Sequence, residues 1–312
     1  MSRRTPRLFA AALAVGALLL GGCAEKTSND TPAAGGSSAA AAFPVTVGKL
    51  TLDKRPEKIV SLSPSATEML FAIGAGKQVT AADDNSNYPP EAPKSDLSGF
   101  QPNAEAIAGK SPDLVLLSND TNKIVDQLTT LKIPVLLTPA AATLDDTYQQ
   151  LTDLGKLTGH PAEADAVTKK MKDDIAALTK DLPQRAKKLT YYHELGPELY
   201  SATSKTFIGS IYALAGLENI ADPADADGKN GGYPQLSQEV IVKANPDFVF
   251  LADTKCCKQT PETVKARSGW AGVTAVKNNQ IVGLDDDIAS RWGPRVVDLL
   301  KAIVDATAKV PA

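Results

Sequence analysis

Short, continuous apolar runs recur along the chain and predict buried strands. Two of them, Leu114–Leu117 and Phe248–Leu251, each follow a Pro-Asp turn. A proline stops the preceding helix, and an unbroken apolar run is typical of a strand buried on both faces of a parallel sheet. Further strands of this kind are predicted at Lys58–Leu62, Pro134–Leu137, Leu189–Tyr192 and Gln280–Leu284.

Two of these strands belong to an internal repeat. Residues 105–117 match residues 239–251 position by position, as a short helix, a Ser-Pro-Asp or Asn-Pro-Asp turn and an apolar strand. A repeat of a whole helix–strand unit predicts two lobes of the same design. The alternation of helices and strands predicts the α/β class, with Rossmann-like lobes built on mostly parallel central sheets.

The strongest helical pattern lies between the lobes. Leucines and a tyrosine recur at helical spacing from Leu144 to Leu157, behind Thr143 as the N-cap. Gly159-His160-Pro161 ends this helix, and a second amphipathic helix starts at Ala162. At 1.5 Å per residue it is roughly 30 Å long, enough to run along both lobes. A single stiff helix as the connection predicts an interlobe cleft whose width changes little.

The N-terminus has the pattern of an export signal. Three arginines precede the apolar run Leu8–Leu20, which is shorter than the roughly 20 residues that span a bilayer. The following Gly21-Gly22-Cys23 resembles the bacterial lipobox, which implies lipidation of Cys23; an ordinary signal peptide with an incidental cysteine is the alternative. The predicted organisation is a signal peptide (1–22), a flexible tether (23–42), an N-terminal lobe (43–158), a bridging helix (159–183) and a C-terminal lobe (184–312).

Composition excludes several classes of function. The 312 residues include 33 Lys and Arg against 36 Asp and Glu, without the basic excess that nucleic-acid binding needs. Two histidines are too few for a multi-histidine metal centre, so we expect no metal site and no cofactor. Gly109-Lys110-Ser111 precedes a strand instead of following one, which argues against a phosphate-binding loop. We therefore expect no catalytic residues.

Several motifs together carry a family resemblance. They are the segment Lys58–Gly74, Asn87-Tyr88-Pro89, Ser111–Val115, Ala215–Ile220, Pro234–Ser237 and Ser290–Arg295. In this order they resemble the solute-binding proteins of ABC importers for cobalamin and iron complexes, over residues 45 to 310. The resemblance implies two lobes bridged by one long helix, in an extracytoplasmic, monomeric receptor that is anchored to the membrane by lipid. It implies cobalamin or a ferric siderophore as the ligand, with haem as a less favoured third candidate, and an ABC permease as the partner.

The resemblance also suggests site residues. Glu68 and Glu218 match surface glutamates, one on each lobe, that dock on the permease. The alternative is that both are ordinary solvated surface charges. Ligand-binding candidates follow from their positions near strand ends in the cleft. They are Asn85, Tyr88, Phe100, His193, Tyr200, Tyr233, Arg291 and Trp292. Of these, Phe100 and Tyr233 match aromatic positions, and Arg291 a cleft arginine, of the cobalamin-binding members.

Cys256-Cys257 is the feature that the family does not explain. Once Cys23 carries lipid, these two cysteines have only each other as partners in an oxidising compartment. A disulfide between neighbours requires a distorted ring, so a vicinal disulfide and two free thiols both remain open. In either form the pair follows a predicted strand and should face the cleft. An anchored enzyme or redox protein that uses this pair is the alternative function, as is a receptor for another small solute.

Overall fold

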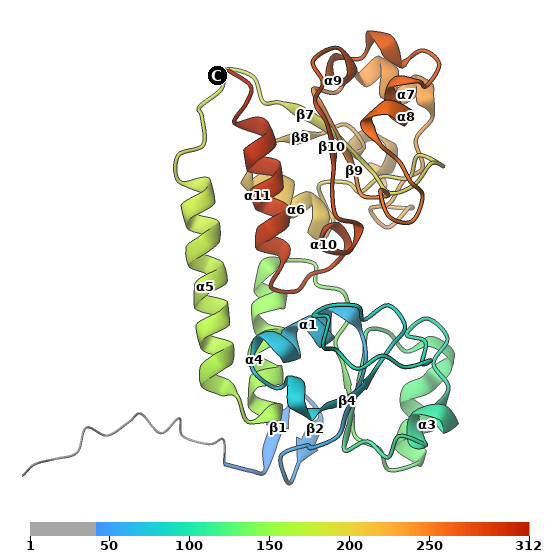
Figure 1. Ribbon diagram of the computed structural model, residues 1–312, viewed down its shortest axis with the longest axis vertical. Coiled ribbons are helices and arrows are strands. Elements are labelled where there is room, and N and C mark those ends of the chain that lie inside the picture. The colour runs from blue at the N-terminus through green and yellow to red at the C-terminus, as the bar shows by residue number, and fades with distance from the viewer. Residues whose placement is uncertain (1–41, 312) are drawn as a thin grey trace, which may run out of the picture. The chain divides into compact units, whose positions relative to one another are not determined.

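The computed structural model describes residues 42–311, which contain two four-stranded parallel sheets (Figure 1). The first has the order β4-β3-β5-β6 and the second the order β8-β7-β9-β10. Their strands are β3 (Ile59–Leu62), β4 (Val79–Ala82), β5 (Leu114–Leu117), β6 (Val135–Leu137), β7 (Thr190–Glu194), β8 (Glu218–Asn219), β9 (Phe248–Leu251) and β10 (Ile281–Gly283). In chain order both sheets run second, first, third, fourth. The predicted α/β fold with two lobes of one design is confirmed.

We call the part of the chain from β1 to α4 the N-lobe and the part from β7 to α11 the C-lobe. The N-lobe contains the antiparallel hairpin β1 (Val45–Val47) and β2 (Leu50–Leu52) and the helices α1 (Pro64–Ala72), α2 (Ala104–Ala108), α3 (Ile124–Thr130) and α4 (Leu144–Thr158). The helix α5 (Pro161–Thr179) follows. The C-lobe contains α6 (Phe207–Leu214), α7 (Gln238–Ala244), α8 (Pro261–Lys265), α9 (Thr274–Lys277), α10 (Asp286–Ser290) and α11 (Val296–Thr307).

The repeat predicted from the sequence is a structural repeat. α2 leads into β5 and α7 leads into β9, and all four residues of each strand are buried. All six strands predicted from apolar runs are present. β4 and β8 were missed, because β4 is a short Val-Thr-Ala-Ala segment and β8 has only two residues, so neither forms an apolar run.

α4 begins and ends where its capping residues predict, and α5 begins at Pro161, one residue before the predicted start. The Thr143 hydroxyl accepts from the Asp146 backbone N–H at 3.3 Å, and the Asp146 carboxylate accepts from the Thr143 backbone at 2.9 Å. Gly159 ends α4 in the left-handed region (φ +78°), which only glycine adopts without steric cost. α5 is about 28 Å long and packs against α4 and α11 (Figure 1).

A continuous apolar core joins the two lobes. One cluster of buried side chains includes Leu70 of α1, Leu151 of α4, Met171 of α5, Phe250 of β9 and Leu300 of α11. Because this core is shared, separating the lobes would expose apolar surface at roughly 25 cal/mol per Å². Two further clusters lie within the individual lobes.

The predicted signal peptide, Cys23 and all but the last residue of the predicted tether lie outside the residues that the structure describes. Within residues 42–311, no helix has both the length and the apolar character needed to cross a membrane.

Candidate ligand-binding site

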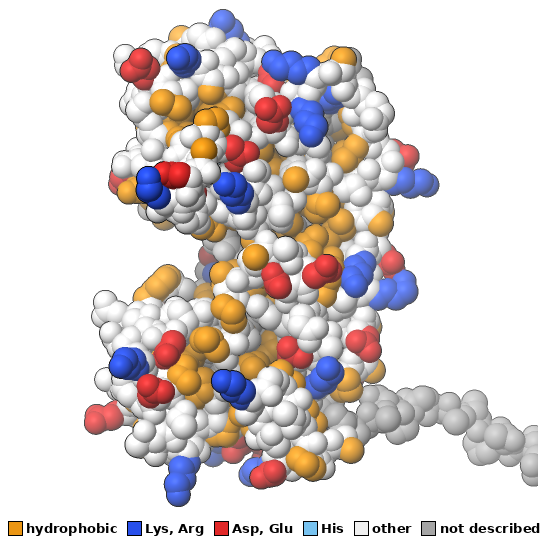
Figure 2. All heavy atoms as spheres, turned by 180° about the vertical axis from the view of Figure 1, so that it is seen from behind, with side chains coloured by type: hydrophobic (Ala, Val, Ile, Leu, Met, Phe, Trp, Pro, Cys, Tyr) orange, Lys and Arg blue, Asp and Glu red, His pale blue; other side chains and the backbone are white. Residues whose placement is uncertain are grey.

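The carboxyl ends of the two sheets meet between the lobes. Asn87, which follows β4, donates from Nδ2 to Asp287 Oδ2 at 3.1 Å, and Asp287 follows β10. The backbone carbonyl of Asn85 accepts from Arg291 Nη2 at 2.9 Å. The loops at the carboxyl ends of parallel strands form the ligand site in most open α/β sheets, so this is where we place the candidate site. Figure 2 shows a hollow between the lobes, on the side away from α5.

An ionic network, which we call the interlobe ion cluster, crosses between the lobes here. It consists of Glu68 of α1, Lys255 after β9, Asp287 of α10, Arg291 and Arg295. Glu68 accepts from Arg291 Nη1 at 2.8 Å and from Arg295 Nε at 2.9 Å and Nη2 at 2.5 Å. Asp287 accepts from Arg291 Nη2 at 2.9 Å and from Lys255 Nζ at 2.8 Å. Burial favours a raised pKa for the Asp287 carboxyl, but its hydrogen bonds with Lys255 and Asn87 and the charge of Arg291 hold the pKa below its usual value.

Glu68 is therefore not the surface carboxylate that the resemblance implied. It is 3% exposed and is neutralised by two arginines of the C-lobe, whereas Glu218 is exposed. A permease could not reach Glu68 without breaking the cluster.

Two other glutamates are exposed at equivalent positions in both lobes. Glu105 lies in the first turn of α2 and Glu239 in the first turn of α7, the two helices of the internal repeat. The signal that pairs them was already visible in the sequence, because Glu105 and Glu239 are the first matched residues of the repeat.

Four of the predicted aromatic residues are exposed, and Tyr88 is the least exposed of them at 41%. Phe100 is 73% exposed, and Tyr200 and Tyr233 are each 44% exposed. Phe100 follows Gly99, whose Cα lies so close to the end of β3 that a Cβ there would come within 3.1 Å of the Leu62 carbonyl oxygen. The absence of a side chain at Gly99 lets the loop lie close against the carboxyl end of the N-lobe sheet.

Tyr200 and Tyr233 lie on neighbouring segments of the C-lobe. The Ser201 N–H donates to the Pro234 carbonyl at 3.0 Å, and the Thr203 N–H donates to the Gly232 carbonyl at 2.8 Å. Tyr200 belongs to the loop that follows β7, so this pair lies at the carboxyl end of the C-lobe sheet. Tyr233 also lines a pocket of about 300 Å³, together with Ala141 from the segment before α4.

Four of the predicted ligand residues contact groups of the protein itself. His193 is 0% exposed and its Nδ1 lies 2.8 Å from the Tyr212 hydroxyl, so it belongs to the core; burial lowers its pKa to about 3. Arg291 is 8% exposed and forms ion pairs with Glu68 and Asp287 in the interlobe ion cluster. The Trp292 indole N–H donates to Gln150 of α4 at 3.0 Å, which holds Trp292 in the contact between lobes. Tyr88 stacks under Arg295, whose guanidinium carbon lies 3.9 Å from the ring centre.

Cys256 and Cys257 form a vicinal disulfide in the loop after β9. Cys256 is exposed and Cys257 is half-buried. The Lys255 and Cys256 N–H groups donate to the Asp286 carboxylate at 2.9 Å each. The loop thus borders the candidate site at the carboxyl end of the C-lobe sheet.

A buried pair of carboxyl groups lies below this loop. Glu194 and Asp253 are both 0% exposed, and Arg267 binds Glu194 with two hydrogen bonds of 2.6 and 2.5 Å. Neither Asp253 oxygen has a hydrogen-bond donor among the described residues. Burial and the charge of Glu194 raise the pKa of Asp253 to about 7. Within residues 42–311, no group of three or more His, Cys, Asp or Glu side chains is arranged to hold a metal ion.

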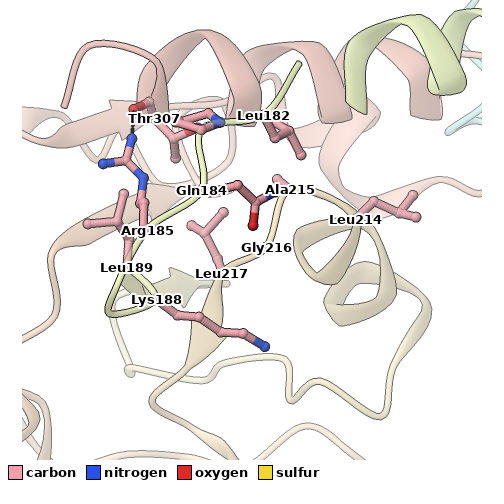
Figure 3. Close-up of a pocket in the computed structure, with 11 residues that line it drawn as sticks. Leu182, Gln184, Arg185, Lys188, Leu189, Leu214, Ala215, Gly216, Leu217 and Thr307 are labelled. Atoms are coloured by element: carbon pink, nitrogen blue, oxygen red, sulfur yellow. Dashed lines mark hydrogen bonds between the residues drawn. The ribbon is translucent and has the colours of Figure 1, made fainter. Parts of the chain in front are cut away.

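A further pocket lies outside the candidate site. Leu182, Leu189 and Leu217 line it, and Arg185 lies at its edge, where Nη2 donates to the Thr307 carbonyl at 3.0 Å (Figure 3). This pocket contains none of the predicted ligand residues, and Arg185 also binds the carbonyl of Val310. We interpret it as a gap at the junction of α6, α11 and the chain after α5.

Comparison with known proteins gives the family. The family model for periplasmic binding proteins matches residues 59–288, which is most of the described chain. The chain belongs to this family. This confirms the resemblance seen in the motifs and agrees with the two-lobed arrangement of the parallel sheets.

Several relatives resemble this member of the periplasmic binding protein family over most of their length. The ABC transporter substrate-binding lipoprotein YvrC of Bacillus subtilis is 29% identical over 314 residues, 95% of each chain. A cobalamin-binding protein of Halobacterium salinarum is 34% identical over 281 residues, which cover 86% of this chain and 75% of that protein. The crystal structure of a possible iron-binding periplasmic solute-binding protein from Staphylococcus epidermidis covers 82% of this chain and 100% of its own, with 28% identity and a TM-score of 0.70.

Proposed function

We propose that the protein is an extracytoplasmic, lipid-anchored receptor that captures a metal chelate between its lobes and delivers it to an ABC permease. Cobalamin is the first candidate ligand and a ferric siderophore the second. The 34% identity to a cobalamin-binding protein supports this order, as does the lipoprotein name of the relative that matches 95% of the chain.

The observation that carries the proposal is the exposed aromatic surface at the carboxyl ends of both sheets. Phe100 is 73% exposed on the loop that Gly99 brings close to the end of β3, and it exposes apolar area that water disfavours. Tyr200 and Tyr233 add flat, amphipathic surface on the opposite lobe. A corrin ring has a broad apolar face with polar groups at its edge, and aromatic rings on two sides of a groove suit such a ligand.

Haem is less well suited to this site. The chain has two histidines, of which His193 is buried in the C-lobe core. The other, His160, lies before α5, with its Nε2 2.7 Å from Arg55 Nη2. His193 lies near the carboxyl end of β7 but is fully buried, so no imidazole of the described residues is offered to a ligand there, and a haem would need a tyrosine as its axial ligand.

For permease docking we propose Glu105 and Glu239 as the pair of carboxylates. They are exposed and equivalent in the two lobes, which Glu68 and Glu218 are not. Two equivalent carboxylates suit a partner with two basic pockets, where such contacts set orientation and association rate more than affinity.

Ligand titration tests the proposal. The full mature protein is incubated with cyanocobalamin, a ferric hydroxamate or haem, and binding is followed by calorimetry and by the absorbance retained after gel filtration. We expect saturable binding of cyanocobalamin with a stoichiometry of one. Saturable binding of the ferric hydroxamate alone would make a ferric siderophore the first candidate ligand in place of cobalamin. Binding of none of the three compounds would refute the proposed ligand class.

Docking is tested separately by charge reversal. The double variant Glu105→Arg/Glu239→Arg should bind ligand normally and lose permease-dependent uptake in cells. The matched control is Glu218→Arg, which reverses another exposed carboxylate of the C-lobe and should leave uptake unchanged. Loss of uptake in the control alone would overturn the assignment.

The anchor at Cys23 has its own test. We expect mass spectrometry of the mature N-terminus to find lipid on Cys23, and Cys23→Ser to release the protein from the membrane fraction. Membrane retention of the Cys23→Ser variant would contradict lipidation at this residue.

A further inference from the structure

We propose that the Cys256–Cys257 disulfide is a thiol–disulfide exchange site that controls ligand affinity at the rim of the interlobe cleft. The ligand part of this inference rests on the function proposed above. The exchange itself does not, because it follows from the exposure and the contacts of the disulfide loop.

The disulfide is accessible to a reductant. Cys256 is exposed and Cys257 half-buried, at the tip of the loop that follows β9. The chain has one other cysteine, Cys23, so within the described residues the pair has no competing sulfur partner. Exchange requires that an attacking thiolate reach a disulfide sulfur in line, and the exposed Cys256 is the side from which a dithiol can approach.

The reaction balances with a dithiol as reductant. One thiolate of the dithiol attacks Sγ of one cysteine, the Cys256–Cys257 bond breaks, and a mixed disulfide forms. The second thiol of the dithiol then displaces the protein sulfur. The protein gains two electrons and two protons as two thiols, and the dithiol leaves as a disulfide.

The contacts of the loop show why opening the disulfide would change its shape. On one side the Asp286 carboxylate accepts from the backbone of Lys255 and Cys256. On the other, the Asp253 carbonyl accepts from the N–H groups of Cys257 and Gln259, at 3.2 and 3.3 Å. The disulfide closes the segment between these two anchors.

Lys258, directly after the disulfide, has an unfavourable backbone conformation. Its φ of +59° lies in the left-handed region, which is less favourable for a non-glycine residue than an ordinary backbone conformation. Lys258 lies between the two N–H groups that bind the Asp253 carbonyl. Opening the covalent ring removes one constraint on this segment, and we expect the loop then to leave the Asp286 carboxylate more often.

The loop is connected to the contact between lobes through Lys255. Its ammonium group binds Asp285 and Asp287 at 2.8 Å each. Asp287 in turn binds Asn87 of the N-lobe and Arg291 of the interlobe ion cluster. A change of the loop therefore alters both the surface at the rim and the polar contacts that hold the lobes at their present separation.

The first test follows the loop itself and needs no ligand. The mature protein is treated with dithiothreitol, and alkylation of the proteolytic fragment that carries both cysteines is measured by mass. We expect no alkylated cysteine before treatment and two after it. Amide hydrogen exchange at Lys255 and Cys256 should accelerate roughly tenfold on reduction, because their bonds to Asp286 are then lost more often. Unchanged exchange rates in a fully alkylatable protein would overturn the proposal.

The second test follows affinity, with cyanocobalamin as the probe. Reduction should weaken binding roughly five- to tenfold, and the variant Cys256→Ser/Cys257→Ser should bind as weakly in both redox conditions. Asp286→Asn keeps the disulfide but weakens the anchor, so it should lower affinity in the oxidised form. Equal affinity of oxidised protein, reduced protein and the serine variant would refute control by the disulfide. If cyanocobalamin binds none of these forms, the proposed ligand is wrong. The amide hydrogen exchange of the first test still shows whether reduction changes the loop.

Discussion

Substitution of Glu68 by Gln tests the role of the interlobe ion cluster most directly. The change keeps the size of the side chain but removes the charge that two arginines share. In the native protein, Glu68 is 3% exposed and accepts three hydrogen bonds, one from Arg291 and two from Arg295. The side chains of Arg291 and Arg295 are only 9% and 17% exposed, so water cannot replace the lost carboxylate freely.

The expected loss of stability is large for a single substitution. Removing one partner of a buried ion pair costs about 3–5 kcal/mol, because the remaining charge is left without compensation. At about 2–4 °C per kcal/mol for a domain of this size, the melting temperature should fall by roughly 10 °C. Because Glu68 belongs to the N-lobe and both arginines to the C-lobe, the loss should also loosen the contact between lobes.

Thermal unfolding followed by circular dichroism measures this effect on protein without ligand. Glu218→Gln is the matched control, since it removes an exposed carboxylate and should change stability by less than about 0.5 kcal/mol. The double variant Glu68→Gln/Arg295→Met should recover part of the loss, because it removes the guanidinium that has lost its carboxylate partner, whereas Arg291 keeps Asp287. A melting temperature for Glu68→Gln equal to that of the Glu218→Gln control would show that the cluster contributes no net stability.

Three further predictions follow from individual residues. Burial and the charge of Glu194 raise the pKa of the Asp253 carboxyl from 3.8 to about 7, so the folded protein binds one proton more than the unfolded chain between these pH values. The free energy of unfolding should therefore fall as pH rises towards 7, by up to about 1.4 kcal/mol per pH unit. Asp253→Asn should flatten this dependence of the melting temperature on pH. Phe100→Ala should weaken cyanocobalamin binding at least about tenfold without lowering the melting temperature, whereas Leu131→Ala, which truncates an exposed side chain after α3, should leave calorimetric affinity unchanged. Thr143→Ala should cost about 1 kcal/mol in urea unfolding, because the N-cap bond of α4 is lost; no change in the urea midpoint would contradict the role of this cap.

The internal repeat and the strand pattern could be read without coordinates because they are local properties. An apolar run such as Phe248–Leu251 is buried on both faces wherever its sheet is placed, and a Thr143 cap acts on N–H groups three residues away. The proline of each Pro-Asp turn likewise acts on its own neighbours. These features predicted six strands, two long helices and two equivalent lobes.

Exposure was decided only by tertiary structure. Glu68 and Glu218 read alike in the sequence, as single carboxylates in a family motif. Glu68 is buried because it meets Arg291 and Arg295, which lie 223 and 227 residues further along the chain. No local pattern predicts a contact over such a separation. The same holds for His193, which is buried because the Tyr212 hydroxyl and the rest of the C-lobe core enclose it.

The sequence by itself thus determined the class of fold, the order of its elements and the place of the cysteine pair after a buried strand. The tertiary structure decided which of the chemically suitable residues face the cleft and which hold the lobes together. The physical reason is that hydrophobic periodicity and capping act within a few residues, whereas burial and ion pairing depend on which strand ends the folded chain brings together. Phe100 remains exposed and Glu68 does not, because one lies on a loop at the end of its sheet and the other meets the arginines of the second lobe.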